Sequence, residues 1–262
     1  MRIARLSLSG RATPAYASVV DDEAELFDAA PWLGGKATGE RVGFREEMLL
    51  APVEPSKILC VGRNYAAHAK ELGHDLPSEP LLFFKPPSAV VGPGDDVLMP
   101  AVSERVDHEA ELALVIGKRA KHLTRANALE HLAGFTAAND VTARDLQKKD
   151  GQWARAKGFD TFCPLGPWVE TVFDEARFAN MVVSCTVDGV ERQRGFTEHM
   201  IFDVATVLVY VSAIFTLEPG DVILTGTPEG VAPLDHGARC TVRIEDRSGT
   251  EIVALSNRFM RA

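Results

Sequence analysis

A β-hairpin is the most strongly specified local structure in this sequence. Two runs rich in apolar and β-branched residues, Met181–Val187 and Val190–Gln193, flank the dipeptide Asp188-Gly189. Aspartate followed by glycine readily adopts the positive φ angles of a two-residue hairpin turn. Since such a short turn joins antiparallel neighbours, the segment favours an antiparallel sheet over a doubly wound parallel one.

Short strands outnumber helices along the rest of the chain. Patterns typical of strands occur at 57–61, 109–116, 135–141 and 222–225, and a second hairpin is expected from 240–244 and 251–255 around Ser248-Gly249. Helices are expected over 124–132, closed by Gly134, from an Asp203 cap to Phe215, and in a short segment capped by Asn64. The expected fold class is therefore α+β, mainly β, with a few short helices.

Prolines interrupt the chain after its first fifty residues. The segment Ala51-Pro52-Val53-Glu54-Pro55-Ser56 cannot continue a regular element, because proline lacks a backbone donor and biases its predecessor toward extended conformations. We therefore expect a small β-rich N-terminal domain over residues 1–52 and a larger domain, which holds the candidates for chemistry, over residues 53–262. A chain of 262 residues can bury a sizeable core by itself.

The charge balance argues against polyanionic partners. The 28 basic and 37 acidic residues give a formal net charge of -9, so we expect neither a nucleic-acid nor a membrane partner. The longest apolar stretch, Val204–Phe215, is shorter than the roughly 20 residues that a membrane span needs. The first residues lack a signal-peptide pattern, so a cytoplasmic location is the expectation. The widely spaced cysteines are expected to be buried free thiols.

Three carboxylates form the most informative constellation in the sequence. Glu109 and Glu111 open an apolar run that ends at Ile116, and their spacing places both on one face of a strand. Asp140, at the end of another apolar strand, supplies a third carboxylate. Like charges entering a core are costly to desolvate unless a cation compensates them, and hard oxygen ligands select Mg²⁺, Mn²⁺ or Ca²⁺ over zinc. Alternatively, the glutamates line a solvated edge and Asp140 caps a turn.

Three further segments carry candidates for chemistry. His68 and Glu71 share a face of a helix, where they form either an acid/base pair or a surface salt bridge. Lys157 offers positive charge for a carboxylate or a developing enolate, unless its segment is a solvated loop. Gly226 and Thr227 offer a backbone amide and a hydroxyl to a substrate carboxylate, or belong to a simple loop.

Five motifs follow one another in an order that is familiar from one enzyme family. They are Gly62-Arg63-Asn64-Tyr65 with His68 and Glu71, His108-Glu109-Ala110-Glu111-Leu112, Asn139-Asp140-Val141-Thr142-Ala143-Arg144-Asp145-Leu146-Gln147, Ala156-Lys157-Gly158-Phe159-Asp160, and Leu224-Thr225-Gly226-Thr227-Pro228. Together they resemble the fumarylacetoacetate hydrolase family, especially its short acylpyruvate hydrolase, oxaloacetate decarboxylase and 2-hydroxyhepta-2,4-diene-1,7-dioate isomerase members. The resemblance runs from Lys57 to Asn257.

The resemblance implies a role for each candidate. It implies Mg²⁺ or Mn²⁺, with Ca²⁺ as another occupant, bound by Glu109, Glu111 and Asp140. It makes His68 and Glu71 the acid/base pair on a mobile lid, and Lys157 the cation on the substrate side. The substrate-binding residues that it implies are Arg63, Tyr65, Gln147, Gly226 and Thr227. A mixed β-sandwich roll with a small N-terminal domain, assembled as a homodimer, is the implied architecture.

The expected function is divalent-metal-dependent chemistry on a small 2-oxo or 2-hydroxy-dienoic acid through a metal-chelated enolate. Hydrolysis of a C–C bond in an acylpyruvate is the first expectation, and the alternatives are oxaloacetate decarboxylation and a hydroxymuconate-type isomerisation or decarboxylation of aromatic catabolism. A noncatalytic metal- or carboxylate-binding module is a further class, against which the joint presence of His68, Glu71 and Lys157 argues. The sequence contains no P-loop and no dinucleotide fingerprint, so no nucleotide cofactor is expected.

Overall fold

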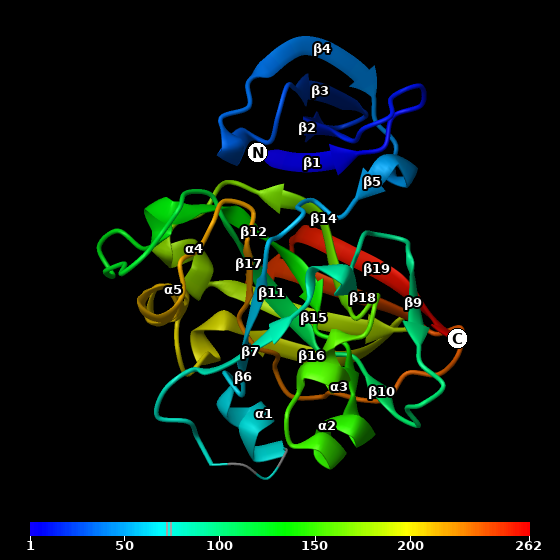
Figure 1. The fold of residues 1–262 in the computed structure, drawn as a ribbon, viewed down its shortest axis with the longest axis vertical. Coiled ribbons are helices and arrows are strands. Elements are labelled where there is room, and N and C mark those ends of the chain that lie inside the picture. Colours follow the sequence, from blue (N-terminus) through cyan, green and yellow to red (C-terminus); the bar gives the residue numbers. More distant parts are fainter. Residues whose placement is uncertain (72, 74) are drawn as a thin grey trace.

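The computed structural model describes residues 1–71, 73 and 75–262, and β-strands dominate it (Figure 1). The strands are β1 (Arg2–Leu6), β2 (Ala15–Val20), β3 (Glu23–Phe27), β4 (Ala37–Gly43), β5 (Leu49–Leu50), β6 (Ile58–Gly62), β7 (Leu81–Lys85), β8 (Val90–Val91), β9 (Asp96–Met99), β10 (Val106–Asp107), β11 (Ala110–Ile116), β12 (Leu132–Asn139), β13 (Thr142–Ala143), β14 (Cys163–Glu170), β15 (Met181–Val187), β16 (Val190–Phe196), β17 (Val222–Leu224), β18 (Arg239–Asp246) and β19 (Glu251–Arg261). The α-helices of the described residues are α1 (Ala66–Glu71), α2 (Arg144–Asp150), α3 (Ala154–Gly158), α4 (Glu175–Ala179) and α5 (Val204–Ile214). The predicted mainly-β fold class is confirmed.

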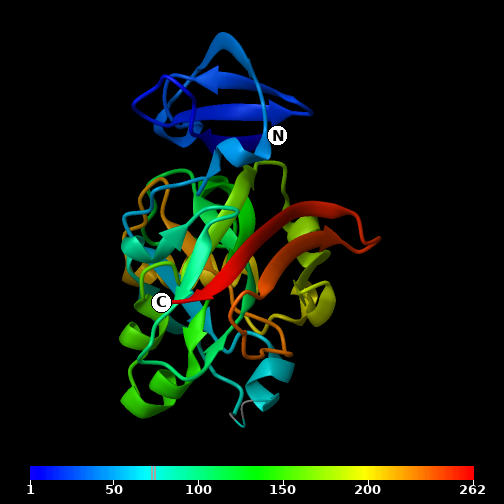
Figure 2. The ribbon, with the colours of Figure 1, turned by 90° about the vertical axis from the view of Figure 1, so that its right-hand side faces the viewer.

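Two sheets form the body of the molecule. The larger has the strand order β4-β3-β2-β1-β14-β12-β11-β17-β6-β7, and the smaller has the order β16-β15-β18-β19-β9. Figure 2 shows the long strands β18 and β19 crossing one side of the molecule. Leu112 and Leu114 of the larger sheet share a hydrophobic cluster with Val183 and Val242 of the smaller one. Burial of these facing side chains holds the two layers together.

Both predicted hairpins are present. Strands β15 and β16 pair antiparallel around Asp188 and Gly189, whose φ angles are +50° and +80°. Strands β18 and β19 pair in the same way, and Gly249 in their connection also has a positive φ. Local turn chemistry therefore predicted two of the four strand pairings of the smaller sheet, β15 with β16 and β18 with β19.

The helix predicted over residues 124–132 is wrong. This segment contains only a short 3-10 turn at Leu129–His131. The side-chain oxygen of Asn127 accepts hydrogen bonds from the backbone N–H of Thr124, at 2.9 Å, and from its hydroxyl, at 3.1 Å. Because asparagine side chains compete in this way with helical hydrogen bonds, the apolar periodicity of the segment did not produce a helix.

The first fifty residues pack around their own small hydrophobic cluster. Ala4, Leu6, Leu26 and Leu49 belong to this cluster, and Trp168 of β14 packs against it. Strand β1 also pairs antiparallel with β14, so the N-terminal strands extend the larger sheet. In both ribbon views these strands lie together at one end of the molecule (Figures 1 and 2). They lie far from the helices α1 to α3, which surround the candidate site described below.

Helix α5 begins where the sequence predicts. Asp203 is its N-cap, and the carboxylate accepts a hydrogen bond from the backbone N–H of Thr206 at 2.8 Å. Arg125 also binds this carboxylate, and its hydrogen bond lowers the pKa of Asp203 to about 2. With 11 residues α5 is too short to cross a bilayer, and the same holds for every other helix within the described residues.

Replacing Asp203 with alanine is expected to lower the free energy of unfolding by about 1 kcal/mol at neutral pH, because α5 loses its cap. The pKa of Asp203 in the fold lies below its ordinary value of 3.8, so the charged group stabilises the fold above that pH. This contribution is lost as the pH falls through the folded-state value. Urea unfolding at neutral and acidic pH measures the difference, which should shrink on acidification. Asp235→Ala, which removes an exposed carboxylate without a capping role, is the control; a difference that grows in acid would contradict this account.

Candidate metal centre

Three buried carboxylates lie at the ends of two neighbouring strands. Glu109 precedes β11, Glu111 belongs to it, and Asp140 follows β12. Because β11 and β12 are antiparallel with Ala110 opposite Asn139, the start of one strand lies beside the end of the other. One oxygen of each carboxylate lies within 4.8 Å of the others. Their burial excludes a solvated edge, and the strand register makes them one oxygen cluster.

Three buried cations surround this cluster. Lys157 of α3 donates to Glu109 at 2.7 Å and to Asp140 at 2.5 Å. Lys85, the last residue of β7, donates to the other oxygen of Asp140 at 2.6 Å. Arg144 of α2 donates to Glu109 and to the buried Asp107, the latter at 2.9 Å. Each of these charges is thereby paired inside a region from which water is largely excluded.

Glu111 differs from the other two carboxylates. Its carboxylate accepts a hydrogen bond from the backbone N–H of Gly226 at 2.6 Å. Within the described residues, no lysine or arginine contacts it. Burial raises the pKa of Glu111 well above its ordinary value, and the charges of Asp140 and Glu109 raise it further. Burial alone would also raise the pKa of Glu109, but Lys157 and Arg144 hold it below its ordinary value. Lys157 acts on Glu111 only through its charge at a distance, so Glu111 is the carboxylate of the cluster that no described cation contacts.

The donor set of the cluster fits a hard divalent cation. All three side chains offer carboxylate oxygens, which Mg²⁺ and Mn²⁺ prefer, whereas zinc favours nitrogen and sulfur. A dication beside Glu111 would compensate the charge that no side chain balances. Three protein ligands leave positions for oxygens of another molecule.

The predicted acid/base pair lies on the helix that covers this cluster. His68 of α1 is buried and lines the same cavity as Glu109, Glu111 and Asp140, so it is no surface residue. Its Nδ1 lies 3.2 Å from Glu71, which also accepts a hydrogen bond from the backbone N–H of Gly230 at 3.1 Å. A carboxylate at Nδ1 favours the tautomer in which the other ring nitrogen is free to exchange a proton. The helix, the pair and the loop at 230 thus hold one another in place.

Asn64 has a different role from the predicted helix cap. Its side-chain oxygen accepts from the backbone N–H of Phe202 at 2.8 Å, while its amide donates to the carbonyls of Phe202 and Thr225. The side chain therefore anchors the start of α1 to two distant loops. A cap could be expected from the local sequence, but these tertiary partners use the groups that capping needs.

The structure places some of the predicted substrate-binding residues in the carboxylate cavity and others outside it. Arg63, Gln147 and Thr227 line the carboxylate cavity, whose volume is about 40 Å³. Gly226 contributes its N–H to Glu111. Tyr65 is buried but is not among the residues that line the cavity, and its hydroxyl has no hydrogen-bond partner within the described chain. The cavity is small, and His68 of α1 forms part of its wall.

Residues 57–260 match the family described as fumarylacetoacetate (FAA) hydrolase, C-terminal, which accounts for most of the chain. The chain belongs to the fumarylacetoacetate hydrolase family. Residues 1–52 match a separate family described as Rv2993c-like, N-terminal.

Relatives of this fumarylacetoacetate hydrolase family chain include several enzymes. The structure of 5-carboxymethyl-2-hydroxymuconate delta-isomerase from Mycobacterium smegmatis has 39% sequence identity and a TM-score of 0.89, and the match covers 100% of both chains. Fumarylpyruvate hydrolase from Pseudomonas aeruginosa, in complex with Mn²⁺ and pyruvate, has 35% identity and a TM-score of 0.72 over 80% of this chain and 91% of that one. The mitochondrial oxaloacetate tautomerase FAHD2A of Homo sapiens is 49% identical over 71% of this chain and 60% of its own length.

Sequence reasoning gave no role to several residues that organise the site in this family member. Lys85 is preceded by the apolar segment Leu81–Phe84, and a lysine that ends such a strand is the signal that could have revealed it. Arg144 lies within the motif that runs from Asn139 to Gln147, but its ion pairs with Asp107 and Glu109 could not be predicted from that motif. Gln193 of β16 is the third: its oxygen accepts from Ala110 N–H at 3.0 Å, and its amide donates to Thr227 at 2.8 Å. The fold brings Lys85 and Arg144 into contact with the carboxylates and Gln193 into contact with the strand that carries Glu111.

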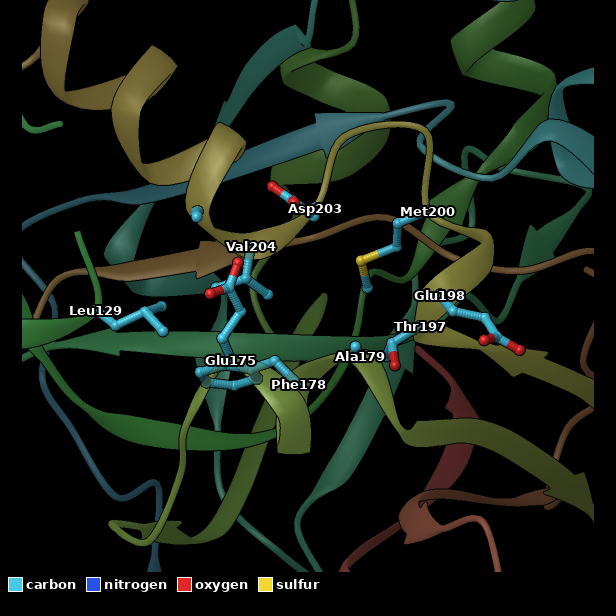
Figure 3. Close-up of a pocket in the computed structure, with 10 residues that line it drawn as sticks. Leu129, Glu175, Phe178, Ala179, Thr197, Glu198, Met200, Asp203 and Val204 are labelled. Atoms are coloured by element: carbon cyan, nitrogen blue, oxygen red, sulfur yellow. The ribbon is translucent and has the colours of Figure 1, made fainter. Parts of the chain in front are cut away.

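A second cavity, of about 270 Å³, lies beside α4 and the start of α5 (Figure 3). Its walls are largely apolar and include Leu129, Phe178 and Met200. Glu175 and Asp203, which also line it, both contact Arg125, so their charges are compensated within the fold. None of its lining residues belongs to the carboxylate cavity, and among the described residues no histidine lines it. The carboxylate cavity, by contrast, brings His68 together with three buried carboxylates.

Proposed function

We propose that this chain is a divalent-metal-dependent enzyme that acts on small 2-oxo acids through an enolate, with C–C bond hydrolysis of acylpyruvates as its first candidate reaction. The observation that carries the proposal is the convergence of Glu109, Glu111 and Asp140 beside the buried His68, whose Nδ1 contacts Glu71. Mn²⁺ or Mg²⁺, held by the three carboxylates, would supply Lewis acidity to the keto oxygen of the substrate. Support comes from the fumarylpyruvate hydrolase relative, whose structure contains Mn²⁺ and pyruvate.

Other side chains of the site would stabilise charge, transfer protons and bind the substrate. Lys157 holds Glu109 and Asp140 in position and adds positive charge where an enolate oxygen would form. Glu71 orients His68, which can take a proton from water during hydrolysis and return it to the enolate carbon. The hydroxyl of Thr227, the guanidinium of Arg63 and the amide of Gln147 line the cavity and can bind the substrate carboxylate.

Proton transfer without hydrolysis is the second candidate reaction. It is favoured by the full-length similarity to a hydroxymuconate delta-isomerase and by the 49% identity to an oxaloacetate tautomerase. The same His68 would then move a proton between oxygen and carbon, and no water would attack. Decarboxylation of oxaloacetate needs the same enolate and neither water nor a base. A homodimer, which the family resemblance implies, is part of the proposal and is tested by sedimentation.

A substrate panel tests the proposal. Purified protein is stripped of metal with a chelator and then assayed with acylpyruvates, oxaloacetate and a 2-hydroxy-dienedioate, with and without added Mn²⁺ or Mg²⁺. Pyruvate release from an acylpyruvate that requires added metal is the expected result. Isomerised dienedioate or tautomerised oxaloacetate, with no pyruvate released, would support the second candidate. Full activity in the stripped protein would refute the metal requirement, and inactivity on the whole panel would refute both candidate reactions.

A further inference from the structure

Two buried cysteines face each other in the smaller sheet. Cys185 of β15 and Cys240 of β18 have sulfur atoms 3.3 Å apart, and both side chains are buried. The strands are antiparallel with Cys185 opposite Val242 and Cys240 opposite Val187, so the two cysteines are diagonal neighbours on one face. Neither cysteine lines the carboxylate cavity.

Hydrogen bonds connect this cysteine pair to the metal centre. The side-chain amide of Asn139 donates to the sulfur of Cys240 at 3.4 Å, and its oxygen accepts from the backbone N–H of Glu109 at 2.9 Å. The side chain of Asn139 therefore links Cys240 to the backbone of Glu109, whose carboxylate belongs to the cluster.

Cys185 is also connected to the candidate site, through Gln193. In the pairing of β15 with β16, Cys185 lies directly opposite Gln193, and the register shifts just after it. The side chain of Gln193 binds the N–H of Ala110 on one side and the hydroxyl of Thr227 on the other. Displacement of the cysteine pair would thus be transmitted both to the carboxylate strand and to the loop at 227.

We propose that Cys185 and Cys240 form a reversible disulfide when a hydroperoxide oxidises them, and that this bond weakens divalent-metal binding at the neighbouring carboxylates. The effect on metal binding rests on the proposed metal centre, whereas formation of the disulfide does not.

The chemistry needs only the two thiols and the peroxide. The thiolate of Cys185 attacks one peroxide oxygen, the O–O bond breaks, and after protonation of the leaving oxygen the products are a sulfenic acid and an alcohol, or water from hydrogen peroxide. The sulfur of Cys240 then attacks the sulfenic sulfur, the S–O bond breaks, and the thiol proton leaves with the hydroxyl as water. The two thiols lose two electrons, and the peroxide gains them.

The environments of the cysteines support this division of roles. A hydrogen bond from Cys240 lowers the pKa of Cys185 to about 6, which favours the thiolate that attacks peroxides. By contrast, burial raises the pKa of Cys163 to about 12 and that of Cys60 well above its ordinary value. Cys60 and Cys163 are therefore expected to remain thiols under mild oxidation.

Closure of the bond explains the effect on the metal centre. The sulfur atoms must approach from 3.3 Å to about 2.05 Å, the length of a disulfide. Cys240 then moves relative to Asn139, which weakens the N–H···S hydrogen bond that orients the Asn139 side chain, and this side chain also accepts from the backbone N–H of Glu109. Loss of a partner of the ligating side chain typically weakens metal binding by about 10- to 100-fold, and because Asn139 binds the backbone of Glu109 we expect an effect at the lower end of that range.

The experiment combines thiol mapping with metal titration. The full chain is treated with hydrogen peroxide, alkylated under denaturing conditions, and mapped by mass spectrometry. Mn²⁺ binding is measured by calorimetry in the reduced, oxidised and re-reduced protein. We expect one bond between Cys185 and Cys240, loss of two hydrogen atoms, and about tenfold or greater weakening of Mn²⁺ binding that a dithiol reverses. Cys240→Ser should abolish both changes, and Cys163→Ser, a buried cysteine outside the pair, should retain both.

Each contrary result has a distinct meaning. If all four cysteines still react as thiols after oxidation, or if the bond forms between Cys60 and Cys163, the disulfide proposal is overturned. A Cys185–Cys240 bond with unchanged Mn²⁺ affinity would overturn the coupling to the metal centre. Failure of the reduced protein to bind Mn²⁺ would instead refute the proposed metal centre, and the mapping would still decide the disulfide.

Discussion

Glu111→Gln is expected to weaken Mn²⁺ binding by more than about 100-fold, because loss of a direct ligand should exceed the 10- to 100-fold effect of losing an outer partner. The same change should leave the metal-free protein at least as stable as the wild type. Glu111 is a buried carboxylate without a cation, so removing its charge relieves a desolvation cost. The glutamine oxygen can still accept from Gly226, and its amide can donate to Asp140.

The two effects of Glu111→Gln are measured separately. Calorimetric titration gives the Mn²⁺ affinity, and thermal unfolding in the presence of chelator gives the stability. Glu104→Gln makes the same chemical change at an exposed position and should alter neither quantity. A variant that binds Mn²⁺ as tightly as the wild type would remove Glu111 from the metal centre. A large loss of stability without metal would show instead that the carboxylate holds the fold together.

His68→Ala is expected to reduce turnover by about 10²- to 10⁴-fold, the usual contribution of a positioned acid or base. Mn²⁺ affinity should stay within a few-fold of the wild type, since His68 contributes no oxygen to the carboxylate cluster. This separation of turnover from metal binding distinguishes a proton-transfer residue from a ligand. Steady-state assays on the best substrate of the panel, together with Mn²⁺ titration, measure the two quantities.

Glu71→Gln supplies an independent check on the same pair. It keeps the size of the side chain and its ability to accept from Gly230, but it removes the charge that orients His68. We expect a smaller loss of turnover than for His68→Ala, together with a changed pH profile. His199→Ala, which removes an exposed histidine, is the control for both variants. Undiminished turnover in His68→Ala would assign the pair a purely structural role on α1.

Much of the local structure could be predicted from the sequence. The Asp188-Gly189 turn and the Asp203 cap of α5 depend on neighbours within a few residues, and both are present. Where a local pattern and a side chain competed, the prediction failed: Asn127 binds the backbone of Thr124, and no helix forms over 124–132. Asn64 failed as a cap for a related reason, since its partners at 202 and 225 are more than a hundred residues away.

Spacing on one strand singled out Glu109 with Glu111, and spacing on one helical turn singled out His68 with Glu71, but their roles and that of Asp140 were predicted from the family resemblance. Tertiary structure alone decided which charges compensate them. Lys85 of β7 contacts Asp140, which follows β12, and no described cation contacts Glu111. Cys185 and Cys240 lie side by side on the neighbouring strands β15 and β18. The periodicity of the sequence does not predict such contacts, because they depend on the order of the strands in the sheets. It also does not show which charges are buried, and burial makes an unpaired charge costly.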